Sequence, residues 1–149
     1  MFFRKATRND LPFIVEMLAN DKLGKLREAY TDPFPDSYHR AFDAIDADPN
    51  QELIVADNGN EIIGTMQITF TPGLTYQGSI RATVEAVRVK ENMTGQGIGQ
   101  QMIEWAIARA RERKAHIIQL TSNKQRPDAI RFYEKVGFIA SHEGLKMEL

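Results

Sequence analysis

The most constraining feature of this sequence is a run in which an apolar strand passes through a glycine-rich turn into a helix. The run reads Val87-Arg88-Val89-Lys90-Glu91-Asn92-Met93-Thr94-Gly95-Gln96-Gly97-Ile98-Gly99-Gln100. Glycine at three alternate positions lets the backbone approach a ligand closely, because glycine has no Cβ. The N–H groups at the start of the helix add the positive end of the helix dipole. The segment therefore predicts a site for a phosphate or pyrophosphate.

Two common phosphate-binding loops do not fit this spacing. The phosphate loop of nucleoside triphosphatases needs Lys and then Ser or Thr after its last glycine, whereas Gln100 and Gln101 follow Gly99. A dinucleotide-binding fold needs Gly or Ala at position 100 and an acid at the end of the next strand. The expected next strand, His116 to Thr121, contains no acid. Both classes are excluded.

The periodicity of apolar residues predicts a mixed α/β chain that forms one domain over residues 1–149. We expect strands at Phe2–Ala6, Leu53–Ala56, Ile62–Phe70, Ile80–Lys90 and His116–Thr121, and a last hairpin at Ile139–Ser141 and Leu145–Leu149. Helices should start near Asp10, at Pro35, at Ile98 and at Pro127. Asp57, Asn58 and Gly59 predict a tight antiparallel hairpin between the second and third strands. The sheet should be mostly antiparallel and twisted, with flanking helices.

One strand contains a slip in its alternation. Ile80, Ala82, Val84 and Ala86 occupy one face, but Val87 and Val89 are the apolar residues beyond that point. A slip of one residue inside a strand is what a β-bulge produces. A bulge leaves backbone N–H and C=O groups without partners, and such groups can bind an extended ligand.

Composition excludes several classes of function. The chain has no Cys and three His residues that are far apart in sequence, so no metal site is expected. The formal net charge is −1, with basic residues spread along the chain, so no nucleic-acid partner is expected. No apolar run approaches membrane-spanning length and none opens the sequence. We expect no membrane partner and a cytoplasmic location.

The glycine-rich run resembles the signature of the GNAT superfamily of acetyl-coenzyme A (acetyl-CoA) dependent N-acetyltransferases, which is Arg/Gln-x-x-Gly-x-Gly/Ala after a Val-x-Val strand end. Here the signature runs from Thr94 to Gly99, with Thr94 in place of Arg or Gln. Residues Ile118–Asn123 and Ala129–Phe138 are similar to the family's next strand and to its Phe-Tyr-x-x-x-Gly-Phe block. The resemblance covers roughly residues 52–149, and before that only the order of elements matches.

The resemblance implies a central pair of strands that splay apart. The pantetheine arm should lie along the bulged strand, bonded to N–H and C=O groups of Val87 and Val89. The implied coenzyme-binding residues are Val87, Arg88, Val89, Thr94, Gly95, Gln96, Gly97, Ile98, Gly99, Gln100 and Asn123. Asn123 has an alternative interpretation, as the residue that caps the turn before Pro127.

The resemblance also implies two catalytic residues. Glu85, at the slip, matches a carboxylate that takes a proton from the acceptor ammonium, and its alternative is an ion pair with Arg81, Arg88 or Lys90. Tyr133 matches a tyrosine that protonates the leaving thiolate. Its alternative is a core aromatic residue, since it lies on the apolar stripe of its helix.

These features together indicate an N-acetyltransferase that moves an acetyl group from acetyl-CoA to a primary amine of a small molecule. The amine would attack directly in a ternary complex, and no metal would take part. Acetylation of a protein or peptide and a non-catalytic acyl-CoA binding module remain as alternatives. The sequence leaves a homodimer open.

Overall fold

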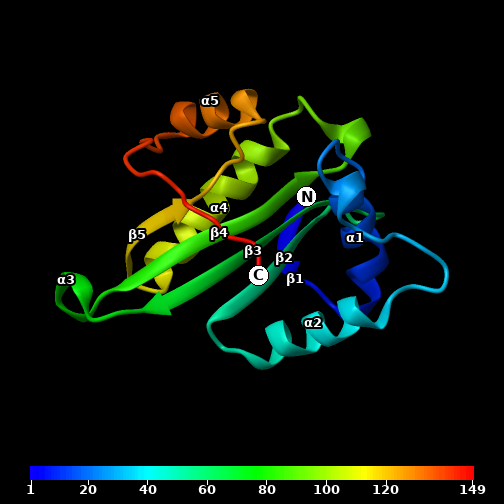
Figure 1. The fold of residues 1–149 in the computed structure, drawn as a ribbon, viewed down its shortest axis with the longest axis horizontal. Coiled ribbons are helices and arrows are strands. Elements are labelled where there is room, and N and C mark those ends of the chain that lie inside the picture. The colour runs from blue at the N-terminus through cyan, green and yellow to red at the C-terminus, as the bar shows by residue number, and fades with distance from the viewer.

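The computed structural model describes residues 1–149, and its centre is a five-stranded sheet in the order β1-β2-β3-β4-β5 (Figure 1). The first four strands pair antiparallel, and β5 runs parallel to β4. The strands are β1 (Phe2–Lys5), β2 (Gln51–Asp57), β3 (Ile62–Pro72), β4 (Ile80–Val89) and β5 (Ala115–Leu120). The helices are α1 (Leu11–Ala19), α2 (Asp36–Ala47), the single turn α3 (Thr75–Gly78), α4 (Ile98–Glu112) and α5 (Pro127–Val136). Short 3₁₀ turns cover Arg8–Asp10, Gly24–Leu26 and Glu91–Met93.

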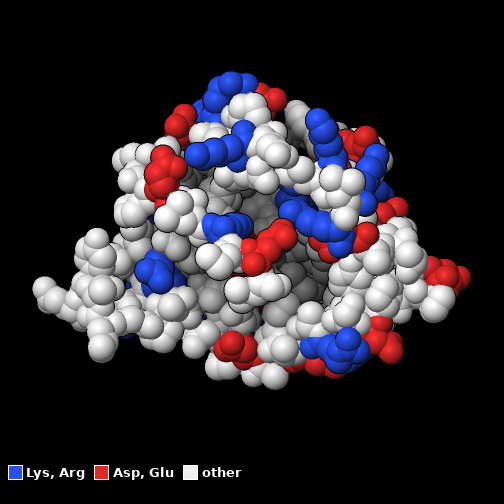
Figure 2. Space-filling model, in the orientation of Figure 1, with Lys and Arg blue, Asp and Glu red and all other residues white.

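The two faces of the sheet bury separate apolar clusters, as strand alternation requires. On one face Met66, Ile68 and Val84 pack against Met102 and other residues of α4. On the opposite face α1 and α2 cover β2 and part of β3. Figure 1 shows α4 and α5 on one side of the sheet, with α1 and α2 on the other. In the same orientation Figure 2 shows a hollow near the middle of the molecule, bordered by side chains of both charges.

A buried ion pair joins the sheet to the C-terminal half of α4. Glu52 on β2 is only 2% exposed and accepts hydrogen bonds of 2.6 to 3.1 Å from Arg109 of α4. Arg113, one turn further along, places its guanidinium 4.2 Å from the centre of the Phe70 ring. A buried carboxylate is stable only when its lone pairs are satisfied, and Arg109 supplies a fork of donors for this purpose. The pair therefore fixes how α4 lies along the sheet.

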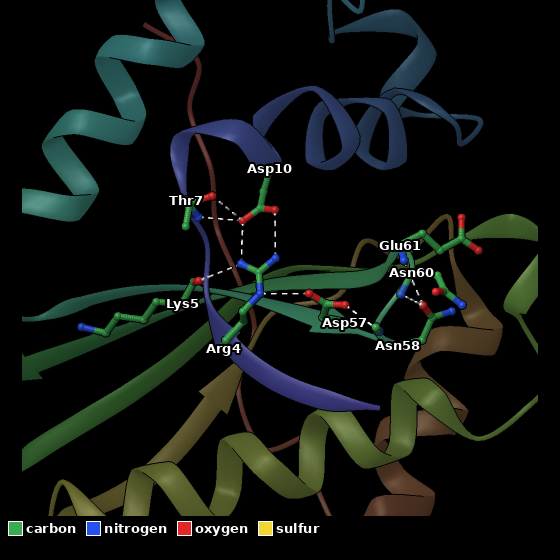
Figure 3. A network of polar contacts seen from close by, with 9 residues as sticks. Arg4, Lys5, Thr7, Asp10, Asp57, Asn58, Asn60 and Glu61 are labelled. Atoms are coloured by element: carbon green, nitrogen blue, oxygen red, sulfur yellow. Dashed lines mark hydrogen bonds and ion pairs between the residues drawn. The ribbon is translucent and has the colours of Figure 1, made fainter.

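A second polar network ties β1 to the start of the helical layer (Figure 3). Arg4 donates to Asp10 at 2.8 and 3.1 Å and to Asp57, at the end of β2, at 3.0 Å. Asp10 also accepts the Thr7 backbone N–H at 2.7 Å, which satisfies a donor at the helix start. Burial raises the pKa of Asp10, but the hydrogen bonds from Arg4 and Thr7 outweigh burial and hold it below its ordinary value. Asp10 is therefore a charged group that the fold stabilises.

Most of the expected elements are confirmed, with shifts of a few residues at their ends. The hairpin between β2 and β3 turns at Gly59, whose φ of +95° only glycine adopts easily. The mixed, mostly antiparallel sheet with flanking helices is also as expected. None of the helices is both long and apolar enough to cross a membrane.

The expected last hairpin is wrong. No residue after α5 belongs to a strand, and Ile139, Leu145, Met147 and Leu149 are 84 to 118% exposed. The alternation of Leu145, Met147 and Leu149 has the period of a strand, but a strand also needs a neighbouring edge to pair with. Residues 145–149 do not lie along an edge of their own sheet, so they have no neighbouring strand to pair with.

We predict that Asp10→Asn lowers the free energy of unfolding by about 1.5 to 3 kcal/mol near neutral pH, since it weakens hydrogen bonds to a buried charge. Because the folded pKa of Asp10 is lowered, its stabilisation is complete above the unfolded pKa and is lost as the pH falls through the folded pKa. In urea unfolding, the difference between wild type and variant should stay constant from about pH 5 to 8 and shrink below about pH 4.

Asp43→Asn is the matched control, because the Arg8–Asp43 ion pair is exposed to solvent. Its effect should stay within about 1 kcal/mol at every pH. Equal losses in the two variants, or a loss from Asp10→Asn that does not change with pH, would contradict this account of Asp10.

Candidate active site

The site begins where β4 and β5 stop pairing. The parallel ladder runs from Ile80 opposite Ala115 to Val84 opposite Leu120 and ends there, while β4 continues to Val89 alongside β3 only. The backbone groups of residues 85–89 that point away from β3 therefore have no strand partner. This divergence confirms the expected splayed pair of central strands.

A β-bulge lies at the same point. Gln67 of β3 is opposite Glu85 and Thr65 is opposite Arg88, so β4 contains one residue more than β3 in this interval. Ala86 has a φ of +52°, a left-handed conformation that non-glycine residues adopt at a cost of about 1 to 2 kcal/mol. The slip in the sequence pattern is therefore a bulge, as predicted, and it bends β4 away from the line of β5.

A cluster of unpaired backbone donors follows β4. The N–H groups from Gly95 to Gln100 donate to no backbone acceptor in the chain, and the last three belong to the first turn of α4. Gly95 and Gly97 have φ of +77° and +79°, and a Cβ on either would meet nothing within 4 Å. The turn thus presents bare donors to open space at the positive end of a 15-residue helix. This is the geometry of an anion site.

The packing beneath the turn fixes its position. A Cβ on Gly99 would lie 3.7 Å from the Phe132 ring and 3.9 Å from Val89. Ile98 is buried, and both Val87 and Val89 pack against the core cluster under α4. The start of α4 is therefore wedged between the end of β4 and α5, which places the donors beside the gap between β4 and β5.

Besides Arg88, three of the predicted coenzyme-binding side chains already have partners within the chain. The Thr94 hydroxyl donates to the Glu91 carbonyl at 2.9 Å, and Gln100 donates to Glu104 at 2.9 Å. Asn123 accepts the Gln125 N–H on its side-chain oxygen at 2.9 Å, so it forms the turn before Pro127 as its alternative interpretation predicted. Its side-chain NH₂ group makes no hydrogen bond and is free for a ligand.

Tyr133 lies on α5 within the apolar cluster, packed edge to face against Phe132 and Phe138. The ring of Tyr133 packs as a core aromatic residue, but the hydroxyl makes no hydrogen bond within the chain. Burial raises the pKa of Tyr133 above 10, and the positive charges of Arg88 and Arg126 only partly offset this effect. The phenol therefore keeps its proton at neutral pH and is available as a proton donor.

Glu85 is exposed and makes no ion pair, so the alternative interpretation, an ion pair with Arg81, Arg88 or Lys90, is not present in the structure. Arg88 pairs with Asp21 and Lys90 pairs with Glu61 instead. The Glu85 carboxylate is free to accept a proton beside the bulge.

Sequence reasoning missed a group of charges at this site. Arg88 and Arg126 approach the same oxygen of Asp21, at 2.9 and 3.0 Å. Burial lowers the pKa of Arg88, the charge of Arg126 lowers it further, and Asp21 opposes both effects. Asp21 follows α1 and is 105 residues from Arg126, so no sequence spacing could have paired them. Arg88 itself was expected at the site, but without this partner.

Comparison with known proteins decides the family. The profile described as Acetyltransferase (GNAT) family matches residues 21–138. The chain belongs to the GNAT acetyltransferase family. It is therefore a member of a family of acetyltransferases, and its sheet with splayed strands is the GNAT fold.

Individual relatives agree with this assignment. An aminoalkylphosphonate N-acetyltransferase from Salmonella typhimurium is 35% identical over 95 residues, which are 64% of this chain and 61% of that enzyme's length. The crystal structure of a transcriptional regulator from Bacillus halodurans C-125 is 61% identical over 99% of both chains, with a TM-score of 0.97. An acetyltransferase from Trypanosoma brucei shares the fold, with 21% identity over 99% of both chains and a TM-score of 0.80.

We predict that Gly97→Ala weakens coenzyme A binding at least tenfold in calorimetry, because a Cβ at a φ of +79° forces the turn to shift its donors. Gly59→Ala is the matched control, since Gly59 also has a positive φ and open space around it but lies in the β2–β3 turn. The two variants should lose similar stability, and only Gly97→Ala should lose affinity. Unchanged affinity in folded Gly97→Ala would place the coenzyme elsewhere.

Proposed function

We propose that this GNAT enzyme transfers the acetyl group of acetyl-CoA to the primary amine of a small molecule by direct attack in a ternary complex. The observation that carries the proposal is the run of free backbone donors from Gly95 to Gln100 beside the open edge of β4. Together they offer one place for a pyrophosphate and another for an extended amide-containing arm. Pantetheine has such an arm, so the residues present fit acetyl-CoA.

Different residues would bind the pyrophosphate and the pantetheine arm of the coenzyme. N–H groups from Gly95 to Gln100 would hold the pyrophosphate, with Gln96 exposed at the tip of the turn. The N–H groups of Val87 and Val89 and the Val89 C=O would pair with the amides of the pantetheine arm, as an added strand does. The Val87 C=O already accepts a hydrogen bond of 2.8 Å from the Arg88 guanidinium. The free NH₂ group of Asn123 lies beyond the end of β5 and can donate to the same arm.

The chemistry needs three proton movements and one stabilised charge. Glu85 would accept a proton from the acceptor ammonium, directly or through water, because only a neutral amine attacks a thioester. A backbone N–H at the bulge would stabilise the negative charge that develops on the carbonyl oxygen during attack. Tyr133, protonated at neutral pH, would give its proton to the leaving thiolate and regain one from the amine nitrogen, which is positively charged after attack and must lose a proton to form the amide. The chain has no Cys, so no acyl-cysteine intermediate can form on it.

One relative supports a small acceptor over a protein acceptor. The Salmonella enzyme is described as acting on aminoalkylphosphonates, which are small amines. The Bacillus halodurans protein is described as a transcriptional regulator, but the free donors and the open strand edge serve no purpose specific to that role. The open edge of β4 beside a protonated tyrosine favours acyl transfer.

The direct test is a screen of amines and peptides for release of the coenzyme A thiol from acetyl-CoA. The proposal expects release with a set of small primary amines and little or none with peptides. Release with peptides alone would make the protein a peptide acetyltransferase. Coenzyme A binding without release for any acceptor would make it a binding module.

We predict that Tyr133→Phe lowers kcat by about two to four orders of magnitude where proton donation limits turnover, because the variant keeps the ring and loses the proton. Coenzyme A affinity and thermal stability should stay close to wild type, since the ring contacts with Phe132 and Phe138 remain. Tyr76→Phe is the control, because Tyr76 is an exposed residue stacked on His116 at the far end of β4. An unchanged kcat in Tyr133→Phe would leave Tyr133 as a core residue only.

A further inference from the structure

Positive charge accumulates at the Tyr133 end of the site. Asp21 uses one oxygen for Arg88 and Arg126 together, and its other oxygen accepts the Leu23 and Gly24 N–H groups at 3.0 and 2.5 Å. Asp21 therefore accepts three hydrogen bonds, from Arg126, Leu23 and Gly24, and its single negative charge faces two guanidinium groups. The charge of Arg27 also acts on Arg88 and, like that of Arg126, lowers its pKa.

One donor in this group has no acceptor. The Arg88 Nε atom is buried and makes no hydrogen bond, because its N–H is not directed at Asp21 although the two atoms are 2.9 Å apart. Buried charged donors without a partner carry a desolvation cost that a bound acceptor removes. Asp21, the ion-pair partner of Arg88, and the neighbouring Arg126 line an open pocket of about 140 Å³, together with Lys22, Leu23 and Gln125. The pocket can admit a small ligand, and its charge favours an anion.

The location of these charges assigns the anion to the acceptor. The phosphates of the coenzyme have their donors at the start of α4, in the turn from Gly95 to Gln100. Arg88 instead lies on β4 beyond its last pairing with β5, and Arg126 directly precedes α5, the helix that carries Tyr133. Both therefore lie beside the gap where the thioester would react, and the section of coenzyme that reaches this point is uncharged. The excess positive charge is therefore placed to meet the other substrate.

We propose that the acceptor is a small amine that also carries an anionic group, a phosphonate, phosphate or carboxylate, and that Arg126, Arg88 and Lys22 bind this group. The proposal rests on the proposed function and names the substrate class of the same site. A guanidinium pair suits such a group, because its forked donors match the oxygens of a phosphonate or carboxylate.

The test compares three acceptors of similar size: 2-aminoethylphosphonate, β-alanine and the neutral ethanolamine. Arg126→Gln should raise KM for the preferred anionic acceptor about 10- to 100-fold, the loss typical of a charged hydrogen bond. KM for ethanolamine and the Kd of coenzyme A should not change. Arg126→Lys should recover part of the loss. Arg131→Gln is the control, since Arg131 is also on α5 but pairs only with Asp128 at the surface.

The outcomes separate this proposal from the proposed function. An equal rise in KM for ethanolamine would show a merely structural role, and a weaker Kd for coenzyme A would assign Arg126 to the coenzyme. Either result overturns the proposal while acetyl transfer stands. If no amine is acetylated, calorimetry of 2-aminoethylphosphonate and β-alanine with wild type and Arg126→Gln still decides whether the pocket binds anions. Absence of binding to wild type would overturn the proposal.

A second and independent feature is the segment 139–149, which we name the arm. Leu145, Met147 and Leu149 alternate with Lys146 and Glu148, and all three apolar side chains are exposed. The sheet has a matching free edge, because β5 is its last strand and exposes Ile117. In Figure 1 the arm leaves α5 and crosses in front of β4 and β3, so it does not reach the outer edge of its own β5.

The crystal structure of the relative from Bacillus halodurans agrees with this fold over 99% of both chains, with a TM-score of 0.97. We infer that residues 145–149 pair with the outer edge of β5 in a second copy of this chain, and that the exchange is reciprocal. An exposed strand edge and an unpaired strand on the same chain satisfy each other across a two-fold axis.

Sedimentation of the full chain and of arm variants tests this inference. The full chain should be a dimer at micromolar concentration, and the chain truncated after Gly144 should be a monomer. Leu145→Asp combined with Met147→Asp should also give a monomer, whereas Lys146→Gln, which keeps the apolar side chains, should remain a dimer. A monomeric full chain, or a truncated chain that is still dimeric, would overturn the inference.

Discussion

The divergence of β4 from β5 beyond Val84 and Leu120 is the constraint on which the rest of the site depends. The ladder ends at Leu120, the last residue of β5, and the extra residue at Ala86 bends β4 directly beyond this point. The left-handed conformation of Ala86 costs about 1 to 2 kcal/mol, and the buried cores on both faces of the sheet hold it in place. The proposed coenzyme-binding and catalytic groups all lie around the gap between β4 and β5.

The site separates two kinds of positive potential. At the start of α4 the potential comes from backbone N–H groups and a helix dipole, which are fixed, uncharged and suited to a pyrophosphate. Near Tyr133 it comes from guanidinium groups that share one carboxylate. The first arrangement needs only glycine and the start of a helix. The second depends on particular side chains and can set which acceptor is used.

Sequence alone predicted the part of the site that local patterns control. The turn from Thr94 to Gly99 needs positive φ at two glycines, and the bulge shows as a break in alternation along a single strand, so both could be found without the fold. The Asp21 contacts could not be found in this way, because they join the loop after α1 to β4 and to the start of α5. The failure at the last hairpin has a related cause. Alternation at Leu145, Met147 and Leu149 reports a preference for strand, but it carries no information about which edge the strand pairs with.

The most direct measurement of the central claim is the set of backbone amide shifts in NMR spectra as coenzyme A is titrated into the protein. If the free donors and the open edge of β4 hold the coenzyme, amides from Gly95 to Gln100 and those at Val87 and Val89 should move together at one affinity. Amides of β1 and α2, on the other side of the sheet, should stay in place. Saturable binding that leaves the Gly95 to Gln100 amides unmoved would contradict this account.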